Sequence, residues 1–304
     1  QFNLANLYND INRTKDALQL FDQLIQSNSV NYEVLFNRGN LFKKEKKLEQ
    51  AIKDYDRVIE IQPLHFNALL NRGNALLGLE EIDEAISSYS RALKINPNLI
   101  EALVSRSSAY SIKKYYDLAI QDYQRILQLK PDHKESYFGI ANALKDQLYL
   151  KEAIEYYHQA IQIDPNYYDA LTNLANALRK IKAFDEAAVF YSRAVQANPN
   201  KPEPYSNLGN ILHDLKRTDL ATDAYAKALE IDPKDKHALY NLGNIFKELN
   251  QLEDALRQFE YVLTLDPESI ETQFAKGMIL LTQGKYKEGF PLYEFRWQRD
   301  SLVK

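Results

Sequence analysis

Prolines at a fixed spacing constrain the fold of this chain more than any other feature. Seven of the ten prolines stand 34 residues apart, at Pro63, Pro97, Pro131, Pro165, Pro199, Pro233 and Pro267. A constant period of this length is typical of stacked repeats, in which each unit buries its apolar face against its neighbours. The 304 residues are therefore expected to form an array, although length alone suggests about two globular domains.

The same period governs the residues between the prolines. We number positions 1 to 34 in units that start at Tyr32, Phe66, Ile100, Lys134, Tyr168, Pro202 and Lys236. Position 20 is alanine in all seven units, and position 24 is tyrosine in six of them and Phe259 in the last. Position 8 is always glycine, alanine or serine. Small and aromatic residues at fixed places predict a core that is repeated in every unit.

Each unit reads as two helices, because apolar residues recur at helical spacing in both halves. In the fifth unit the helices are expected from about Asp169 to Ile181 and from about Asp185 to Ala197. An acidic residue starts the second helix in six units, which predicts a cap for the free N–H groups there. The periodic proline ends that helix, since proline cannot continue the hydrogen-bond ladder.

The 34-residue period, with a small residue at position 8, Ala at 20, Tyr at 24 and Pro at 32, resembles the tetratricopeptide repeat. The resemblance implies an all-α, right-handed superhelical solenoid whose first helices line a concave groove. It also implies seven full units over residues 32–269 and a partial unit over 1–31. Residues 270–304 are expected to form a divergent unit or capping helix, in which Pro291 makes the second helix start late.

Composition weighs against several classes of function. The formal net charge is −4, whereas nucleic-acid binders usually carry an excess of basic residues. No apolar run is long enough to span a membrane. There is no cysteine, and the five histidines lie in different units without metal-ligand spacing. We therefore expect no enzyme activity in this chain alone, no cofactor or metal, no nucleic-acid or membrane partner, and a cytoplasmic location.

Asparagine is the informative residue. At positions 6 and 9, which share one face of the first helix, the full units carry Asn37, Asn40, Asn71, Asn74, Asn142, Asn173, Asn176, Asn207, Asn210, Asn241 and Asn244. Asparagine is a poor helix former, by up to about 0.7 kcal/mol relative to alanine. One interpretation is a ladder of amides that binds the backbone of an extended peptide. The other is that the amides bond adjacent helices or were inherited as the units duplicated.

The proposed ladder has a gap and an edge. Serines fill the ladder positions of the third unit, and Gly139 stands at position 6 of the fourth. We therefore expect the continuous stretch from Asn173 to Asn244 to be the stronger peptide site. Basic residues at position 12, including Lys145, Arg179 and Lys247, are expected along the groove edge. Position 5 lacks the lysine with which chaperone-binding relatives grip a terminal carboxylate, so that mode is disfavoured.

A second reading comes from the C-terminal segment Gly289-Phe290-Pro291-Leu292-Tyr293-Glu294-Phe295-Arg296-Trp297. It is similar to a segment of many bacterial tetratricopeptide proteins that leads into a glycosyltransferase-like domain. The words Asn-Leu-Ala-Asn and Asn-Leu-Gly-Asn also resemble the repeat arm of O-linked N-acetylglucosamine transferase. The first hypothesis is a non-catalytic scaffold for a protein or peptide ligand. The alternative is the substrate-recruiting arm of a glycosyltransferase whose catalytic domain lies beyond Lys304, and self-association through the solenoid ends is a third.

Overall fold

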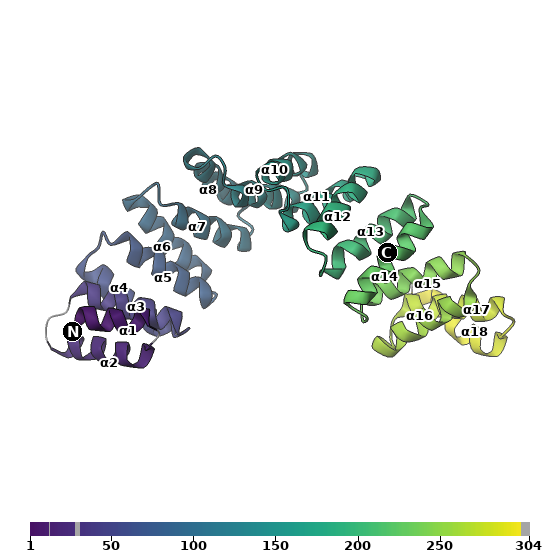
Figure 1. The fold of residues 1–304 in the computed structure, drawn as a ribbon, viewed down its shortest axis with the longest axis horizontal. Coiled ribbons are helices and arrows are strands. Elements are labelled where there is room, and N and C mark those ends of the chain that lie inside the picture. The colour runs from purple at the N-terminus through teal and green to yellow at the C-terminus, as the bar shows by residue number, and fades with distance from the viewer. Residues whose placement is uncertain (12, 28–30, 299–304) are drawn as a thin grey trace. The chain divides into compact units, whose positions relative to one another are not determined.

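The computed structural model describes residues 1–11, 13–27 and 31–298, which form eighteen α-helices and no strand (Figure 1). The predicted all-α class is confirmed. By backbone contacts the chain divides into two compact units, Gln1–Ala160 and Ile161–Lys304. In both, helices pair in chain order. We call the odd-numbered first members A helices and the even-numbered second members B helices.

The first compact unit holds α1 (Phe2–Asp10), α2 (Thr14–Gln26), α3 (Tyr32–Lys44), α4 (Leu48–Ile61), α5 (Phe66–Gly78), α6 (Ile82–Ile95), α7 (Ile100–Ile112), α8 (Tyr116–Leu129), α9 (Lys134–Asp146) and most of α10 (Leu150–Ile163). The second holds α11 (Tyr168–Lys180), α12 (Phe184–Ala197), α13 (Pro202–Asp214), α14 (Thr218–Ile231), α15 (Lys236–Glu248), α16 (Leu252–Leu265), α17 (Ile270–Thr282) and α18 (Tyr286–Tyr293). The bounds of α11 and α12 lie within one residue of those expected from the sequence.

The core repeats with the sequence. The alanines at position 20, from Ala51 to Ala255, are completely buried, and the rings at position 24 lie beside them in the interior. In the four units with glycine at position 8, the ring from position 24 of the same unit lies directly against it. A Cβ atom added at Gly73 would lie 2.5 Å from a ring carbon of Tyr89. The missing side chain thus lets the A helix approach its B helix in these units.

The turn between the A and B helices has a feature that the sequence did not reveal. Residue 15 of each unit has a positive φ, between 58° and 67° at Lys46, Glu80, Lys114, Leu148, Lys182, Lys216 and Asn250. The backbone around Lys46 forms a Schellman motif, in which Lys47 N–H donates to the Phe42 carbonyl at 2.8 Å and Lys46 N–H to the Lys43 carbonyl at 3.0 Å. Glycine usually fills this left-handed place, but only the last turn uses it, at Gly284.

The predicted capping role of the acidic residues is wrong. The N-cap residues of α4, α6, α8, α12, α14 and α16 accept no side-chain hydrogen bond from their helices. The acids, such as Asp185 in α12, lie one residue inside the first turn instead. There they favour the helix through its positive N-terminal charge rather than through a bond to a free N–H group.

The final B helix also departs from expectation. α18 begins at Tyr286, the same place as in the other units, so the predicted late start is wrong. Pro291 lies inside the helix, and the helix ends at Tyr293 after 8 residues, whereas the other full B helices have 14. Tyr293 stacks on Phe274 with ring centroids 5.6 Å apart, while Phe290 and Trp297 are exposed. Part of the aromatic segment therefore covers the preceding helix and part faces solvent.

Candidate peptide-binding face

All eleven predicted asparagines lie on A helices and are partly exposed. The structure shows how most of their amides are held. We call the surface formed by positions 6, 9 and 12 of the A helices the amide face. It is described separately for each compact unit.

The asparagines at position 9 accept a hydrogen bond from the tyrosine at position 24 of their own unit. The hydroxyl donates to Oδ1 at 2.8 Å for Tyr55–Asn40, 2.9 Å for Tyr89–Asn74, and 2.6 Å for Tyr157–Asn142, Tyr191–Asn176 and Tyr225–Asn210. Burial raises the pKa of Tyr89 and of Tyr191 to about 12, so both hydroxyls remain protonated donors in ordinary buffers. Position 9 therefore links the surface of the A helix to the buried ring of the B helix.

The asparagines at position 6 reach the preceding repeat. Asn71 Nδ2 donates to Asn40 Oδ1 at 2.9 Å, Asn241 Nδ2 to Asn210 Oδ1 at 2.8 Å, and Asn37 Nδ2 to Asn6 Oδ1 at 3.2 Å. Lys43 also donates to Asn71 Oδ1, at 2.7 Å. Because an ammonium group can only donate, this bond fixes the orientation of the Asn71 amide. We call the chain of bonds from position 6 to position 9 to the tyrosine the amide relay.

Apart from Asn71, the amides of the relay each have one half without an internal partner. The position-9 oxygen of Asn40 or Asn210 accepts two internal bonds, while its Nδ2 group has no bond among the described residues. At position 6 the arrangement is reversed, since Nδ2 of Asn37 and Asn241 donates internally and Oδ1 has no partner in the described part of the chain. The pair Asn210 and Asn241 thus presents one NH2 donor and one carbonyl acceptor in a fixed orientation, whereas Oδ1 of Asn71 already accepts from Lys43.

Two asparagines in the second compact unit stand outside this pattern. Asn207 makes no hydrogen bond to any residue that the structure describes, so both halves of its partly exposed amide are without an internal partner. Asn244 has no tyrosine to bond, because its unit carries Phe259 at position 24, and its oxygen accepts from Lys247 at 3.2 Å. Asn210, Asn241 and Asn244 line a hollow of about 350 Å³, together with His213, Asp214, Tyr225 and Glu248. Two of these lining residues contact each other, with His213 Nε2 and Glu248 Oε2 2.9 Å apart.

The gap in the third and fourth units has a packing cause. Ser107 fills position 8, where glycine or alanine leaves room in other units, and is fully buried. The ring of Tyr123 lies against Gly139 of the next unit instead, so a Cβ there would be 2.4 Å from its Cζ atom. An asparagine at position 139 would clash with this ring. The relay is interrupted because the tyrosine has taken the place of an amide.

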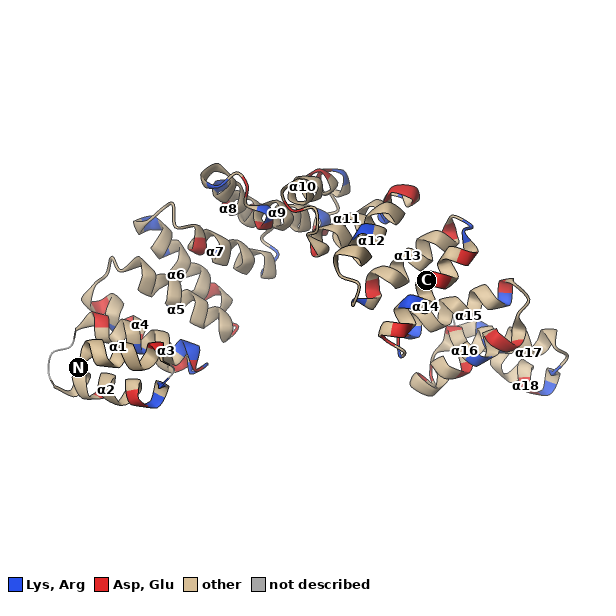
Figure 2. Ribbon diagram, in the orientation of Figure 1, with Lys and Arg blue, Asp and Glu red and all other residues tan. Residues whose placement is uncertain are grey.

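The expected groove-edge cations lie in different surroundings. Lys247 bonds Asn244 within the amide face, and Lys145 pairs with Asp146 at 3.4 Å. Arg179 forms no salt bridge with the described residues. Residues of both signs lie along each compact unit (Figure 2). The place of these cations along a groove edge stays a prediction, and no group of three or more potential metal ligands occurs in the described residues.

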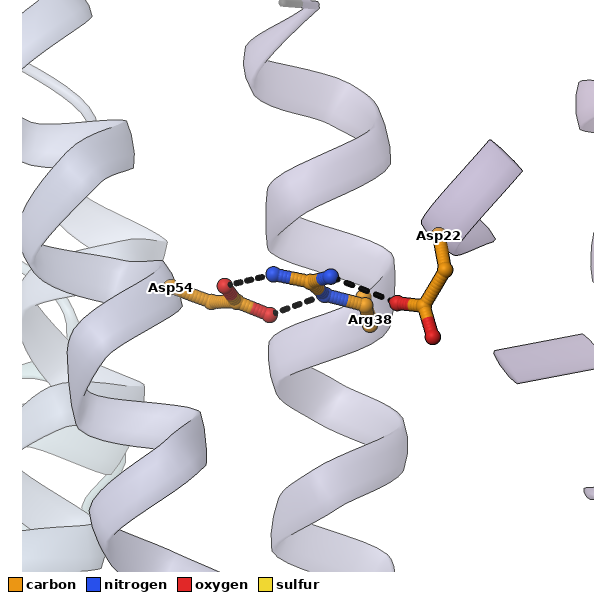
Figure 3. A network of polar contacts seen from close by, with 3 residues as sticks. All are labelled: Asp22, Arg38 and Asp54. Atoms are coloured by element: carbon orange, nitrogen blue, oxygen red, sulfur yellow. Dashed lines mark hydrogen bonds and ion pairs between the residues drawn. The ribbon is translucent and has the colours of Figure 1, made fainter. Parts of the chain in front are cut away.

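Sequence reasoning missed a second set of interactions, on the B-helix side. Arg38, at position 7, donates two bonds to Asp54 at 2.6 and 2.8 Å and a third to Asp22 of the preceding repeat at 2.6 Å (Figure 3). Arg72 and Arg106 bridge the corresponding residues of their repeats. The signal was present as arginines spaced by 34 residues, opposite Asp or Ser at positions 23 and 25.

Comparison with known proteins agrees with this geometry. Models of the tetratricopeptide repeat match residues 32–64, 66–99, 100–133, 150–211, 202–235 and 224–257, together more than half of the chain. The chain therefore belongs to the tetratricopeptide repeat family, and its fold is a tetratricopeptide α-solenoid. No helix in the described residues has the length and apolarity needed to cross a membrane.

Solved structures of such proteins share the fold. The C-terminal part of a repeat-containing protein from Cytophaga hutchinsonii matches 79% of this chain and 98% of its own, with 17% identity and a TM-score of 0.69. A crystal structure of MamA matches 53% of this chain and 94% of its own, with 22% identity and a TM-score of 0.51. These identities establish likeness of fold alone. No curated protein matches the sequence, and the likeness to glycosyltransferase repeat arms stays a prediction.

Proposed function

We propose that this chain is a protein-interaction scaffold whose amide face binds the backbone of an extended peptide. The observation that carries the proposal is the fixed orientation of the amides. In the relay of Asn241, Asn210 and Tyr225, the NH2 group at position 9 and the carbonyl oxygen at position 6 have no internal partner among the described residues. A peptide unit offers the complementary pair, one carbonyl and one N–H group, whatever its side chain.

The spacing of repeats suits an extended ligand. Packed helices lie about 8–10 Å apart, and an extended chain rises about 3.3 Å per residue. Equivalent amides would therefore meet a peptide about every three residues. Because the relay already holds these amides, the ligand does not have to order them on binding, which lowers the entropic cost of association.

The second compact unit is the favoured part of the face. Asn207 has an amide without internal bonds, and Asn244 is released from the tyrosine that holds its equivalents. The two residues lie on neighbouring A helices. Asn244 also lines the hollow at Asn210 and Asn241. The ligand would thus find one amide without internal bonds here, at Asn207, and three half-used ones, whereas Gly139 and Ser105 offer no amide in the earlier repeats.

The test uses peptides selected on the intact chain from a randomised library of unstructured peptides. The double change Asn207→Ala and Asn244→Ala removes no tyrosine bond, and Asn200→Ala in a nearby loop is the matched control. We expect the double variant to bind a selected peptide at least about tenfold more weakly, since two backbone hydrogen bonds are lost. Methylation of the peptide's backbone nitrogens should have the same effect. Unchanged affinity after both changes would overturn the proposal.

A further inference from the structure

A second hollow, on the B-helix side of the second compact unit, is larger than the one at the amide face. It has a volume of about 600 Å³ and lies between α12 and α14, above α13. Its floor is apolar and includes Ala188, Leu208, Leu212 and Ala224. Val189 on α12 and Leu220 on α14 line its two sides. We call this hollow the B groove.

The other repeats serve as internal controls for the residues on its sides. Val189 is 57% exposed and Leu220 is 54% exposed. At the position of Val189 the six other full units carry Lys53, Ser87, Gln121, Glu155, Asp223 and Arg257, all of them polar. At the position of Leu220 five of the six other units carry Glu, Gln or Asp, and the exception is Leu118. Two exposed aliphatic residues have therefore replaced polar ones on both sides of the same hollow.

The floor departs from the repeat pattern in the same place. Ala188 stands at position 21, where the first four units have isoleucine, and Ala224 stands at position 23, where the two preceding units have Tyr156 and Phe190. Leu208 is only partly buried, whereas the aliphatic residues at its position in the fourth, fifth and seventh units, Ile140, Leu174 and Leu242, are buried. Smaller neighbours have thus opened the surface above Leu208.

The B groove occupies the place that an arginine fills in the first three units. There Arg38 bridges position 25 of the preceding B helix and position 23 of its own (Figure 3). The equivalents in the B groove are Leu208, Ser192 and Ala224, all of which line the hollow. An ion-pair bridge has been replaced by an apolar opening, so this part of the B-helix surface is suited to receive apolar side chains.

The chemistry of the floor favours a helical ligand over an extended one. The Ser192 hydroxyl already donates to the carbonyl of Ala188 at 2.8 Å, and the remaining floor residues carry no side-chain amide or carboxylate. An extended peptide laid on this floor would leave its backbone groups without partners, while a helix satisfies its own. From Asp185 to Gln196, α12 offers a length of about 16 Å, which matches about three turns of a partner helix.

Some of the charged side chains around the groove form salt bridges and others do not. Arg217 pairs with Asp185 at 3.0 Å, and Lys227 pairs with Glu230 at 2.7 Å. Arg193 donates to the backbone carbonyl of Pro165 at 3.1 Å and lies over the ring of Phe190, but forms no salt bridge with any described carboxylate. Asp223 also lines the groove and forms no salt bridge with the described residues, so a ligand carboxylate that lies near Arg193 and away from Asp223 would supply the missing partner.

We propose that the B groove binds the apolar face of a short amphipathic helix from a partner protein, with an acidic side chain that pairs with Arg193. Aliphatic or aromatic side chains at helical spacing would lie between Val189 and Leu220 above Leu208. This mode, in which a helix lies in a groove with anchors at positions i, i+3 or i+4 and i+7, is independent of the amide face, since the two surfaces share no residue.

The experiment selects from a phage-displayed library of helix-forming peptides against the intact chain. Variants Val189→Glu and Leu220→Glu carry a residue that other units already have at these positions, such as Glu155 and Glu152, so they are expected to fold. The control is Leu118→Glu, the same change at an equivalent exposed position, 41% exposed, away from the groove. Circular dichroism and thermal unfolding verify that each variant is folded.

The proposal expects selected peptides with apolar residues at helical spacing and an acidic residue towards one end. Val189→Glu with Leu220→Glu should weaken binding at least about tenfold, because burial of two aliphatic side chains is lost, while Leu118→Glu should not. Arg193→Gln should weaken acidic peptides only, and a proline in the middle of the peptide should abolish binding. Selection of non-helical peptides, or equal binding by the groove variants, would overturn the proposal. So would self-association of the wild type that the groove variants abolish, since the occupant would then be a second copy.

Discussion

The hydroxyl of Tyr225 donates to Asn210 Oδ1 at 2.6 Å, and the same oxygen accepts a bond from Asn241 of the following repeat. One amide thus joins the core of its own repeat to the surface of the next. Asparagine at these positions has a structural role as well as the binding role that we propose. The two roles use different atoms, and they can be separated by substitution.

We predict that Asn210→Ala lowers the free energy of unfolding by about 1–3 kcal/mol, since it leaves the buried Tyr225 hydroxyl without its acceptor. Asn207→Ala should leave stability unchanged or raise it slightly, because it removes no internal bond and alanine is the better helix former. Urea unfolding of both variants measures the difference. A similar loss in the two variants would contradict the distinction between them.

The bridge at Arg38 predicts a rescue. Arg38→Leu should destabilise the protein by about 3–5 kcal/mol, because Asp54 stays buried without its partner. Adding Asp54→Ala recreates the pair Leu208 and Ala224 of the sixth unit and should recover most of the loss. The double variant is compared with each single variant by denaturant unfolding. Simple addition of the two single effects would show that the ion pair is not coupled.

The ring of Tyr123 predicts a size constraint at Gly139. Gly139→Ala should destabilise by about 1–3 kcal/mol through overpacking, since the new Cβ would meet the ring. Adding Ser107→Gly should reduce this loss by giving the ring the place that it takes in other repeats. Thermal unfolding of the single and double variants measures the effect, with Ser107→Gly alone as control. Equal destabilisation by Gly139→Ala in both backgrounds would contradict the ring-exchange explanation.

The buried tyrosines predict sensitivity to alkali. Tyr89 and Tyr191 have pKa values raised to about 12 by burial, while an unfolded chain ionises near pH 10. Above about pH 10 the folded state holds more protons than the unfolded state, so stability falls as pH rises. Each ring should contribute a loss of about 2 kcal/mol by pH 12. Tyr191→Phe should reduce the difference in urea stability between about pH 8 and pH 11, and Tyr286→Phe, at an exposed ring, should not.

The left-handed turns predict a stabilising change. Leu148 is 74% exposed and has a φ of 67°, a conformation that strains a residue with a Cβ by about 1–2 kcal/mol. Leu148→Gly relieves this strain, partly offset by the greater freedom of glycine in the unfolded chain, so we expect a gain of up to about 1 kcal/mol. Leu64→Gly, at another exposed leucine without a positive φ, should give no gain. A loss of stability at Leu148 would show that its side chain makes a stabilising contact.

Much of this architecture could be predicted from the sequence because the same residue types recur at the same position in every 34-residue unit. The prolines fixed the length of the unit, and Ala51 and its equivalents fixed the core side of each B helix. The turns could not be predicted, since Lys46 and Leu148 are not residues that usually adopt a positive φ. The capping role predicted for the acids at the starts of the B helices was wrong, because they stand two residues after the N-cap, as Asp185 does after Ala183.

The candidate sites were only partly foreseen. The row of asparagines was visible, but a sequence does not show that Tyr225 and Asn241 meet at one oxygen of Asn210. The B groove could not be predicted from the sequence, because a single valine or leucine on a helix, such as Val189 or Leu220, does not indicate a binding surface. They become informative when each is compared with the same position in other repeats and when the fold places them on opposite sides of one hollow.

The interruption at Gly139 has a mechanical consequence. In a linear array each repeat is held mainly by its two neighbours, and the amide relay adds a bond across the junction wherever it is complete, as between Asn40 and Asn71. The junction before Gly139 lacks that bond. If the chain is pulled from its two ends, we expect the first compact unit to separate at this junction at a lower force than at the junction between Asn40 and Asn71. A force-extension measurement should therefore show an unfolding intermediate. An asparagine at position 139, together with a smaller residue in place of Tyr123, should remove that intermediate.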